Sequence, residues 1–288
     1  MRVLHVRLPC SRAELAAQVV ARLPAGAALL VVDQVTSNTG IVMPLAEIIA
    51  GARAKAPGCL ILVDGAHGVG QLELDLPALG CDFFVGNFHK WLCSARGLGL
   101  LYARTPELAA RVRAAVVSHG FGGGFTSEFL WDGCRDYSTA VALPELLDWW
   151  AAGERIARAR DYCRALLAEA LALLEAAWGT RAHMPRDCYA NMGCVELPTA
   201  CLPPGAVGTD GAVRVTSTHG KMLQDALHFG CRVEVPVKVL DGRAFVRVSA
   251  QIYNERADFE ALAAAVSAMR WRKVPGSDAV ELVGAGDA

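Results

Sequence analysis

The sequence predicts an α/β protein with a large N-terminal domain built on a mostly parallel sheet and a smaller α+β domain after it. Two observations predict this division. In the first half, short continuous apolar runs alternate with helical segments, which is typical of strands buried on both faces of a parallel sheet. Beyond residue 180, short strands are instead followed by one long helical segment.

Four strands and three helices are predicted in the first half of the chain, from apolar runs and from helical periodicity. The strands are 26–33, 59–64, 81–86 and 97–103, and the helices are 11–23, 44–56 and 105–116. The fourth strand follows the third closely enough to run antiparallel to it.

A long helical pattern from 139 to 178 breaks near Gly153. We therefore predict a large domain at 1–153 and a small C-terminal α+β domain at 154–288. The small domain is expected to contain strands at 193–198, 231–237 and 244–250, a loop at 203–218 and a helix at 256–271. The tail after about residue 273 is expected to be mobile.

Composition argues against several classes of protein. The 288 residues are 53% hydrophobic and 20% charged, so the chain can bury a sizeable core. The 28 basic and 29 acidic residues leave a formal net charge of −1, with no basic surplus for nucleic acid or a membrane surface. No apolar run reaches the roughly eighteen residues that predict a membrane-spanning helix.

Ten scattered cysteines form no C-x-x-C pair, which disfavours zinc-ribbon and thioredoxin-like motifs. Several lie in apolar stretches, where a free thiol behaves as a small hydrophobic side chain. The first ten residues do not have the pattern of a secretory signal. We therefore expect a reducing, cytoplasmic location.

Polar side chains follow two neighbouring predicted strands. Asp64 and His67 come at the end of one, and Asn87, His89 and Lys90 at the end of the next. In open α/β sheets, ligands bind beyond the carboxyl ends of the strands. A lysine amine can bond to the aldehyde of pyridoxal phosphate (PLP), and a carboxylate can hold a proton on the pyridine nitrogen. His89 could donate a hydrogen bond to a phosphate oxygen.

Each of these residues also has a simpler explanation. Asp64 could cap a turn, His67 could be structural, and Lys90 could face solvent. A metal site on Asp64, His67 and His89 is disfavoured because the adjacent lysine would repel a cation. The Gly-rich stretch 118–125 neither follows a strand nor opens a helix, so we reject a dinucleotide site there.

Several motifs together resemble one family. "DGAH" at Asp64 and "NFHKW" at Asn87 are joined in the same order by "DQVTSNTG", "SHGFGGGFTSEFLWDGCRD" and "FVRVSAQIYNE". They resemble the class V aminotransferases, within fold type I of the PLP-dependent enzymes. The similarity is greatest to the isopenicillin N epimerase-like branch, which includes lyases acting on sulfur amino acids. The resemblance implies a three-layer large domain, a homodimer and an amino-acid substrate.

The resemblance also assigns roles to residues. Lys90 matches the Schiff-base lysine, Asp64 the partner of the pyridine nitrogen, and His67 the residue that hydrogen-bonds the phenolic oxygen. Asn87 and His89 match phosphate contacts.

Three further positions of the family lie away from these strand ends. Ser37 matches a polar residue close to cofactor and substrate, and Arg247 matches the arginine that binds the substrate carboxylate. Gly133-Cys134 stands where the family usually has Gly-Thr, whose hydroxyl reaches the phosphate of the neighbouring subunit. A thiol is a weaker donor than that hydroxyl.

The same residues could serve three reactions. Lys90 would remove the Cα proton of the substrate as general base. Epimerisation, β-elimination and transamination all remain open after that step. A persulfide-forming desulfurase is disfavoured, because no cysteine lies between Cys231 and Arg247.

The family's N-terminal segment supplies a phosphate loop and an aromatic ring that stacks on the cofactor. Here "DQVTS" begins at residue 33, so we expect a large domain without that segment. The competing hypothesis is therefore a catalytically silent fragment that no longer binds PLP.

Overall fold

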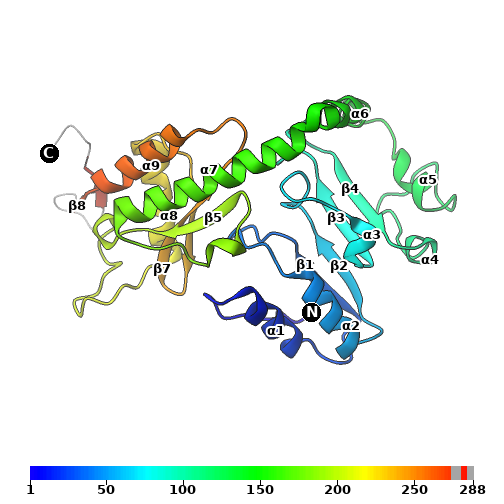
Figure 1. Cartoon of the computed structure of the whole chain (residues 1–288), viewed down its shortest axis with the longest axis horizontal. Helices are drawn as coiled ribbons and strands as arrows, with labels where there is room; N and C mark the ends of the chain where they lie inside the picture. Colours follow the sequence, from blue (N-terminus) through cyan, green and yellow to red (C-terminus); the bar gives the residue numbers. More distant parts are fainter. Residues whose placement is uncertain (274–279, 284–288) are drawn as a thin grey trace. The chain divides into compact units, whose positions relative to one another are not determined.

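The computed structural model describes residues 1–273 and 280–283, and these residues form two compact units (Figure 1). Unit 1 consists of 1–7, 12–36 and 42–160, and unit 2 consists of 8–11, 37–41 and the chain from 161 onward. The domain boundary at 153/154 stays a prediction. Within the described residues, no helix has the length and apolarity needed to cross a membrane.

Unit 1 is built on a four-stranded sheet in the order β1-β2-β3-β4 (Figure 1). Its strands are β1 (Leu29–Asp33), β2 (Leu60–Asp64), β3 (Phe83–Asn87) and β4 (Gly99–Ala103). β1, β2 and β3 pair in parallel, whereas β4 pairs antiparallel with β3. The predicted α/β class, the four strands and the reversed fourth strand are therefore confirmed.

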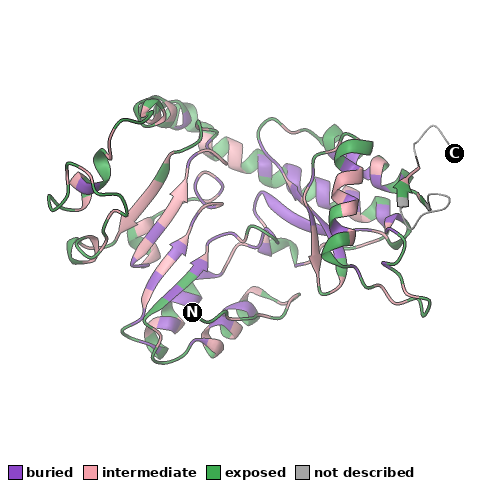
Figure 2. Cartoon of the chain, turned by 180° about the vertical axis from the view of Figure 1, so that it is seen from behind, coloured by how far each residue is buried: buried purple, intermediate pink, exposed green. Residues whose placement is uncertain are grey.

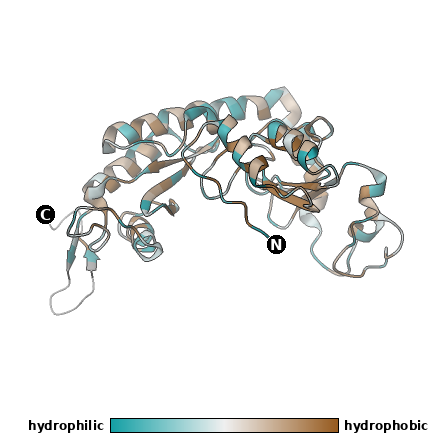
Figure 3. Cartoon of the chain, turned by 90° about the horizontal axis from the view of Figure 1, so that it is seen from below, coloured by the Kyte–Doolittle hydropathy of each residue, from teal (hydrophilic) through white to brown (hydrophobic). Residues whose placement is uncertain are grey.

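One face of this sheet is the core of unit 1. Leu30 and Val32 of β1 and Ile61 and Val63 of β2 are buried in one hydrophobic cluster with helices α1 (Arg12–Arg22) and α2 (Leu45–Lys55) (Figure 2). Side chains alternate between the faces of a strand, so the residues between these four point to the opposite face. There Leu29 and Val31 are exposed. Figure 3 shows the brown of hydrophobic residues along the strands of this sheet.

A buried carboxylate joins the elements around β2 and β3. Asp82 accepts hydrogen bonds from Arg53 of α2 (2.7 Å), from Arg104 after β4 (2.8 Å) and from the backbone amide of Ile61 (2.8 Å). Burial alone raises the pKa of Asp82, but these donors outweigh it and hold the pKa below its ordinary value.

The remaining helices of unit 1 differ in part from the prediction. The helix expected at 105–116 is limited to one turn, α4 (Pro106–Ala109), and none of its residues is buried. Without a buried face, the intrinsic propensity of the following residues does not sustain a helix. The other helices are α3 (Leu76–Leu79), α5 (Phe125–Leu130) and α6 (Ser138–Ala151). The break near Gly153 is confirmed: its φ is +58°, a left-handed conformation that interrupts the helix.

Unit 2 packs a three-stranded antiparallel sheet against helices. The strand order is β5-β7-β6, with β5 at Met192–Glu196, β6 at Val237–Leu240 and β7 at Arg243–Ser249. The helices are α7 (Arg155–Trp178, which begins in unit 1), α8 (Ser217–Asp225) and α9 (Arg256–Ala268). Leu171, Leu174, Val246 and Phe259 are among the buried residues of this core.

The strand predicted at 231–237 was wrong. The amide of Val233 donates to the carbonyl of Leu227 (2.8 Å), so it turns back toward the end of the preceding helix. Arg232 adopts φ +56°, and Pro236 has no N–H for a ladder, so pairing starts only at Val237.

Two other predictions concern the loop at 203–218 and the tail after residue 273. The loop predicted at 203–218 ends where α8 begins, at Ser217. Most of the tail after 273 lies outside the described residues. Val280–Leu282, however, forms β9, which pairs with β8 at Trp271–Lys273.

Candidate active site

The ends of β1 and β2 bring two carboxylates side by side. Asp33 and Asp64 are the last residues of their strands and are register partners in the parallel pair. The amide of Gln34 donates to the carbonyl of Asp64 (2.7 Å), so the pairing continues to the point where the strands end. Both carboxylates project on the face opposite the buried Val32 and Val63.

A tight turn carries His67 beyond the end of β2. The Asp64 carboxylate accepts a hydrogen bond from the amide of Ala66 (2.9 Å), and the amide of Gly68 donates to the carbonyl of Gly65 (2.8 Å). A Cβ at Gly65 would lie 1.9 Å from the ring of Phe84, so only glycine fits there. These contacts fix the direction of the Asp64 side chain.

The segment after β3 carries Lys90 and packs against that turn. The rings of His67 and Trp91 meet edge to face with centroids 6.5 Å apart. Gly70 has φ +84°, and a Cβ there would lie 2.9 Å from Leu92. The indole N–H of Trp150 donates to the carbonyl of Leu92 (3.0 Å) and anchors the segment to α6.

Charge interactions also connect Lys90 with the carboxylates of Asp33 and Asp64. Half-burial raises the pKa of Asp33, and the negative charge of Asp64 raises it further. The positive charge of Lys90 acts on the same carboxylate and lowers its pKa. Asp33, Asp64 and Lys90 therefore lie within electrostatic reach of one another.

Three buried polar atoms of this region have no hydrogen-bond partner in the part of the chain described. They are Oε1 of Gln34, Oδ1 of Asn87 and Nδ1 of His89. Native structures leave few such atoms, since each one costs about 1–3 kcal/mol. Several of them beside the strand ends indicate the place of a polar ligand.

Gly133 and Cys134 lie apart from this group, in the loop between α5 and α6. The Gly133 carbonyl accepts hydrogen bonds from Tyr137 Oη (2.9 Å) and Trp131 Nε1 (2.5 Å). Cys134 is exposed. The loop is thus held by its own aromatic side chains and presents the thiol to solvent.

Ser37 and Arg247 come together in unit 2. Arg247 Nη1 donates to the backbone carbonyl of Ser37 (2.5 Å), while the buried Nε has no partner among the described residues. Burial lowers the pKa of Arg247, an effect that Cys194 opposes. Arg247 also lines a cavity of about 530 Å³ with Tyr253 and Asn254. A guanidinium with an unused buried donor is suited to bind a carboxylate.

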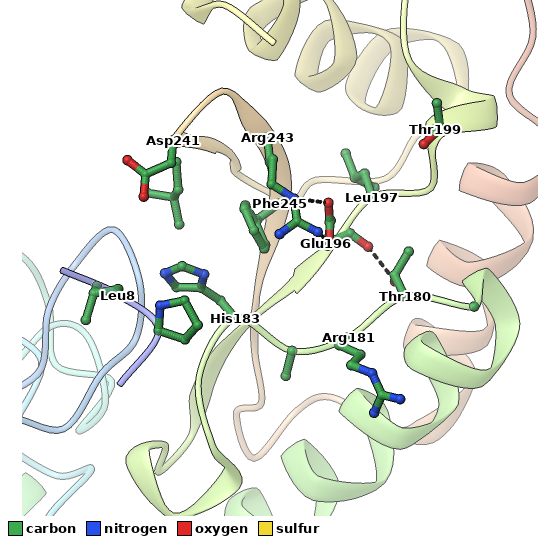
Figure 4. Close-up of a pocket in the computed structure, with 14 residues that line it drawn as sticks. Leu8, Thr180, Arg181, His183, Glu196, Leu197, Thr199, Asp241, Arg243 and Phe245 are labelled. Atoms are coloured by element: carbon green, nitrogen blue, oxygen red, sulfur yellow. Dashed lines mark hydrogen bonds and ion pairs between the residues drawn. The ribbon is translucent and has the colours of Figure 1, made fainter. Parts of the chain in front are cut away.

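A second cavity of about 530 Å³ lies elsewhere in unit 2 (Figure 4). Glu196 and Arg243 form an ion pair at its side (Nε–Oε1 2.5 Å), and His183 packs edge to face on Phe245 at 4.9 Å. Burial lowers the pKa of His183. None of the predicted site residues lines this cavity.

Two residues of the strand-end group were not assigned a role from the sequence. The sequence contains a signal that could have pointed to Asp33 as a site residue, because Asp33 ends an apolar strand just as Asp64 does. The sequence contains no such signal for Gln34, whose Oε1 is buried without a partner among the described residues and would lie 1.7 Å from a Cβ at Gly68.

A lysine and two carboxylates at the ends of neighbouring parallel strands, beside unpartnered buried polar atoms, define a ligand site of an α/β enzyme. The chain belongs to the aminotransferase class-V family, whose model matches residues 14–262. The enzymes of this family depend on pyridoxal phosphate.

The relatives include lyases and epimerases. The chain is 29% identical to the L-cysteine desulfhydrase of Arabidopsis thaliana over 250 residues, which cover 83% of the chain and 54% of that protein. It is 32% identical to the isopenicillin N epimerase of Streptomyces clavuligerus over 284 residues, 91% of the chain and 65% of that protein. The chain thus spans about half the length of the first curated relatives it matches.

Solved structures agree on the fold. A cystine C-S lyase in complex with cysteine persulfide superposes with a TM-score of 0.68 at 18% identity, covering 89% of this chain and 66% of the lyase. A cysteine desulfurase from Escherichia coli gives a TM-score of 0.66 at 22% identity, with coverage of 90% and 63%. The fold is therefore that of fold type I PLP-dependent enzymes.

The strand-end residues fit this cofactor. PLP offers an aldehyde, a phenolic oxygen, a ring nitrogen and a phosphate. Lys90 supplies an amine and Asp64 a carboxylate, and the unpartnered atoms of Asn87 and His89 can meet polar groups. The mixture of an amine, carboxylates, amides and imidazoles matches these groups in chemical type.

Proposed function

We propose that this chain carries the active site of a PLP-dependent enzyme that acts on an amino acid. The observation that supports this most is the cluster of Lys90, Asp64 and Asp33 at the ends of three neighbouring strands. It combines an amine that can bond to an aldehyde with carboxylates that can hold a proton on a ring nitrogen.

The residues that the sequence analysis singled out have separate tasks in this proposal. Lys90 binds the aldehyde carbon, and Asp64, whose direction is fixed by the Ala66 amide, faces the ring nitrogen. His67 donates to the phenolic oxygen, and Asn87 and His89 contact the phosphate. When bound, PLP withdraws electrons from the substrate and so acidifies its Cα–H bond.

Arg247 and Lys90 act on the amino acid itself. Arg247 binds the substrate carboxylate through its buried, unused Nε, and Ser37 keeps the guanidinium in place through its carbonyl. Lys90 would hold the aldehyde of PLP, and its amine would serve as the general base that accepts the Cα proton.

β-Elimination of sulfur from cysteine is the first reaction to test. Four relatives at 29–31% identity bear the name L-cysteine desulfhydrase. The second candidate is epimerisation, because two relatives at 32% identity are isopenicillin N epimerases. A persulfide on Cys231 is not part of the proposal, since burial raises the pKa of that thiol and disfavours the thiolate.

The active form would be a cytoplasmic homodimer. Val117, Phe121, Leu130 and Val141 are exposed in the segment around the Gly133 loop, and an apolar surface of this kind favours association with a second copy. In the described structure the ten cysteines form no disulfide, which suits a reducing compartment.

Titration of the purified chain with PLP tests the proposal. We expect a visible absorption band that saturates with PLP, and its loss in Lys90→Ala, because the band requires an imine between the aldehyde and the Lys90 amine. Lys221→Ala is the matched control, since Lys221 is exposed and pairs with Asp225. A chain that stays colourless with excess PLP would establish the silent fragment instead.

The reaction is then assayed on a panel of amino acids. Release of sulfide, pyruvate and ammonia from cysteine marks elimination, loss of optical rotation marks epimerisation, and a keto acid marks transamination. Elimination is the expected outcome, and a keto acid without sulfide would contradict it.

A further inference from the structure

The carboxylate at the end of β1 has no role in the reaction described above. We propose that Asp33 is a positioning residue that acts through Asp64 and Lys90: its negative charge makes the ring nitrogen of the cofactor and the nitrogen of Lys90 hold their protons more tightly. This inference rests on the proposed function, because it concerns how the same strand-end site treats PLP.

Register places Asp33 beside Asp64. The two residues are Cα partners in the parallel pair of β1 and β2, whose strands lie about 4.8 Å apart as in any sheet. Both follow a buried valine, so both project on the face opposite the core. Their carboxylates therefore approach the same ligand.

Asp33 holds its place without a local donor. The Asp64 carboxylate accepts the amide of Ala66 at 2.9 Å. Among the hydrogen bonds and ion pairs of the described residues, none involves the Asp33 carboxylate. Its charged neighbours are Asp64 from β2, which repels it, and Lys90 from the segment after β3, which attracts it. A half-buried acid with this environment gains most from a cation brought in by a ligand.

The charge balance gives Asp33 its effect. With all three groups ionised, two carboxylates face one ammonium, a surplus of one negative charge. With PLP bound, that surplus would act on the nitrogen of Lys90 and on the ring nitrogen. Asp64 would hold the ring proton directly, and Asp33 would make that proton and the one on the Lys90 nitrogen harder to remove.

Spectroscopic titration of the PLP-loaded chain tests this. The visible band fades as the Lys90 nitrogen loses its proton at high pH. In Asp33→Asn we expect the midpoint of this change to fall by about one pH unit, the size of effect of one charge at close range across a partly solvated site. Asp33→Glu keeps the charge and should keep the midpoint near that of the wild type.

Glu73→Gln is the matched control, because it removes one exposed charge in the same unit. An unchanged midpoint in Asp33→Asn, with the band still present, would overturn the inference and leave the proposed function standing. Absence of the band in the wild type would instead defeat the proposed function, and the inference with it.

A measurement on the wild type covers the case in which Asp33→Asn does not fold. Carboxyl ¹³C resonances of aspartate can be followed against pH with and without PLP. We expect the titration of Asp33 to move to lower pH when PLP binds, because the ligand brings a ring cation close to it. A titration that PLP leaves unchanged would overturn the inference.

Discussion

Lys90 and Arg247 illustrate how single residues divide the chemistry of the chain. Lys90 follows β3 on a segment anchored by Trp150, in electrostatic reach of Asp33. Arg247 lies in the middle of β7, paired in register with Cys194. A side chain in the middle of a strand is held more rigidly than one on a loop, which suits a group that fixes the substrate's orientation.

The prediction at this scale concerns Arg247. Arg247→Lys should raise KM for the amino acid about tenfold or more and change kcat little, because a lysine cannot bind a carboxylate with two parallel donors. Steady-state kinetics over a range of substrate concentrations measure both constants. Arg256→Lys is the control, since Arg256 is exposed and pairs with Glu169 and Glu260. A fall in kcat at constant KM would contradict the assignment.

At the scale of elements, Asp82 connects α2, β2 and the segment after β4 through Arg53, Ile61 and Arg104. The same elements carry the strand ends that form the site, so these contacts of Asp82 also stabilise the site. Because its carboxylate is buried and both cations are only partly exposed, the energetic contribution should exceed that of a surface pair.

We therefore predict that Asp82→Asn lowers the free energy of unfolding by about 3 kcal/mol at neutral pH. The folded-state pKa of Asp82 is lowered, so its contribution is present above the unfolded pKa of about 4 and is lost as pH falls through the folded value. Urea unfolding at about pH 7 and about pH 3 should show the difference between variant and wild type shrinking in acid.

Asp210→Asn is the control for this experiment. It breaks an ion pair with Arg214 in which both side chains are exposed, so it should change the free energy of unfolding far less than Asp82→Asn does. A difference for Asp82→Asn that stays the same in acid would mean that the carboxylate's charge is not what matters.

The success of sequence-based prediction varied by element for physical reasons. The strands ending at Asp64 and Asn87 could be predicted because continuous apolar runs reflect burial. The helix at 105–116 failed because its propensity has no packing surface to support it. The strand at 231–237 failed because the hydrogen bond from Val233 back to Leu227, the positive φ of Arg232 and the missing N–H of Pro236 delay strand pairing until Val237.

The residues of the candidate site could likewise be predicted only where a local sequence pattern marks them. Asp64 and Lys90 could be proposed because polar residues at strand ends stand out against apolar runs. Asp33 needed the register of β1 against β2, and the contact of Arg247 with the Ser37 carbonyl joins residues 210 positions apart. No local pattern contains either relation, and the functions of all these residues stay predictions.

At the scale of the whole molecule, exposed apolar side chains concentrate around the Gly133 loop. Leu130 is 73% exposed and Val141 78% exposed, unusually high for such residues in a folded chain. The Gly133 carbonyl accepts hydrogen bonds from Trp131 and Tyr137, and α5 before the loop is anchored by the buried Glu128, which pairs with Arg113 at 2.8 Å. Because this loop is already ordered and has an apolar surface, it can bind a partner with little loss of conformational entropy.

We predict that Leu130→Glu converts a dimer into a monomer, because a buried, unpaired charge would oppose association. Sedimentation equilibrium should give twice the chain mass of 30.5 kDa for the wild type and a single chain mass for the variant. Phe229→Glu, an equally exposed aromatic position in unit 2, should leave the dimer intact. A wild-type chain that sediments as a monomer would refute the dimer.

The bond between Lys90 and PLP is the claim on which the whole account depends, and chemical trapping tests it most directly. The PLP-loaded chain is reduced with borohydride, digested and mapped by mass spectrometry. We expect one modified lysine, in the peptide that contains "NFHKW". A modification on another lysine, or none at all in a chain that has taken up PLP, would contradict the account.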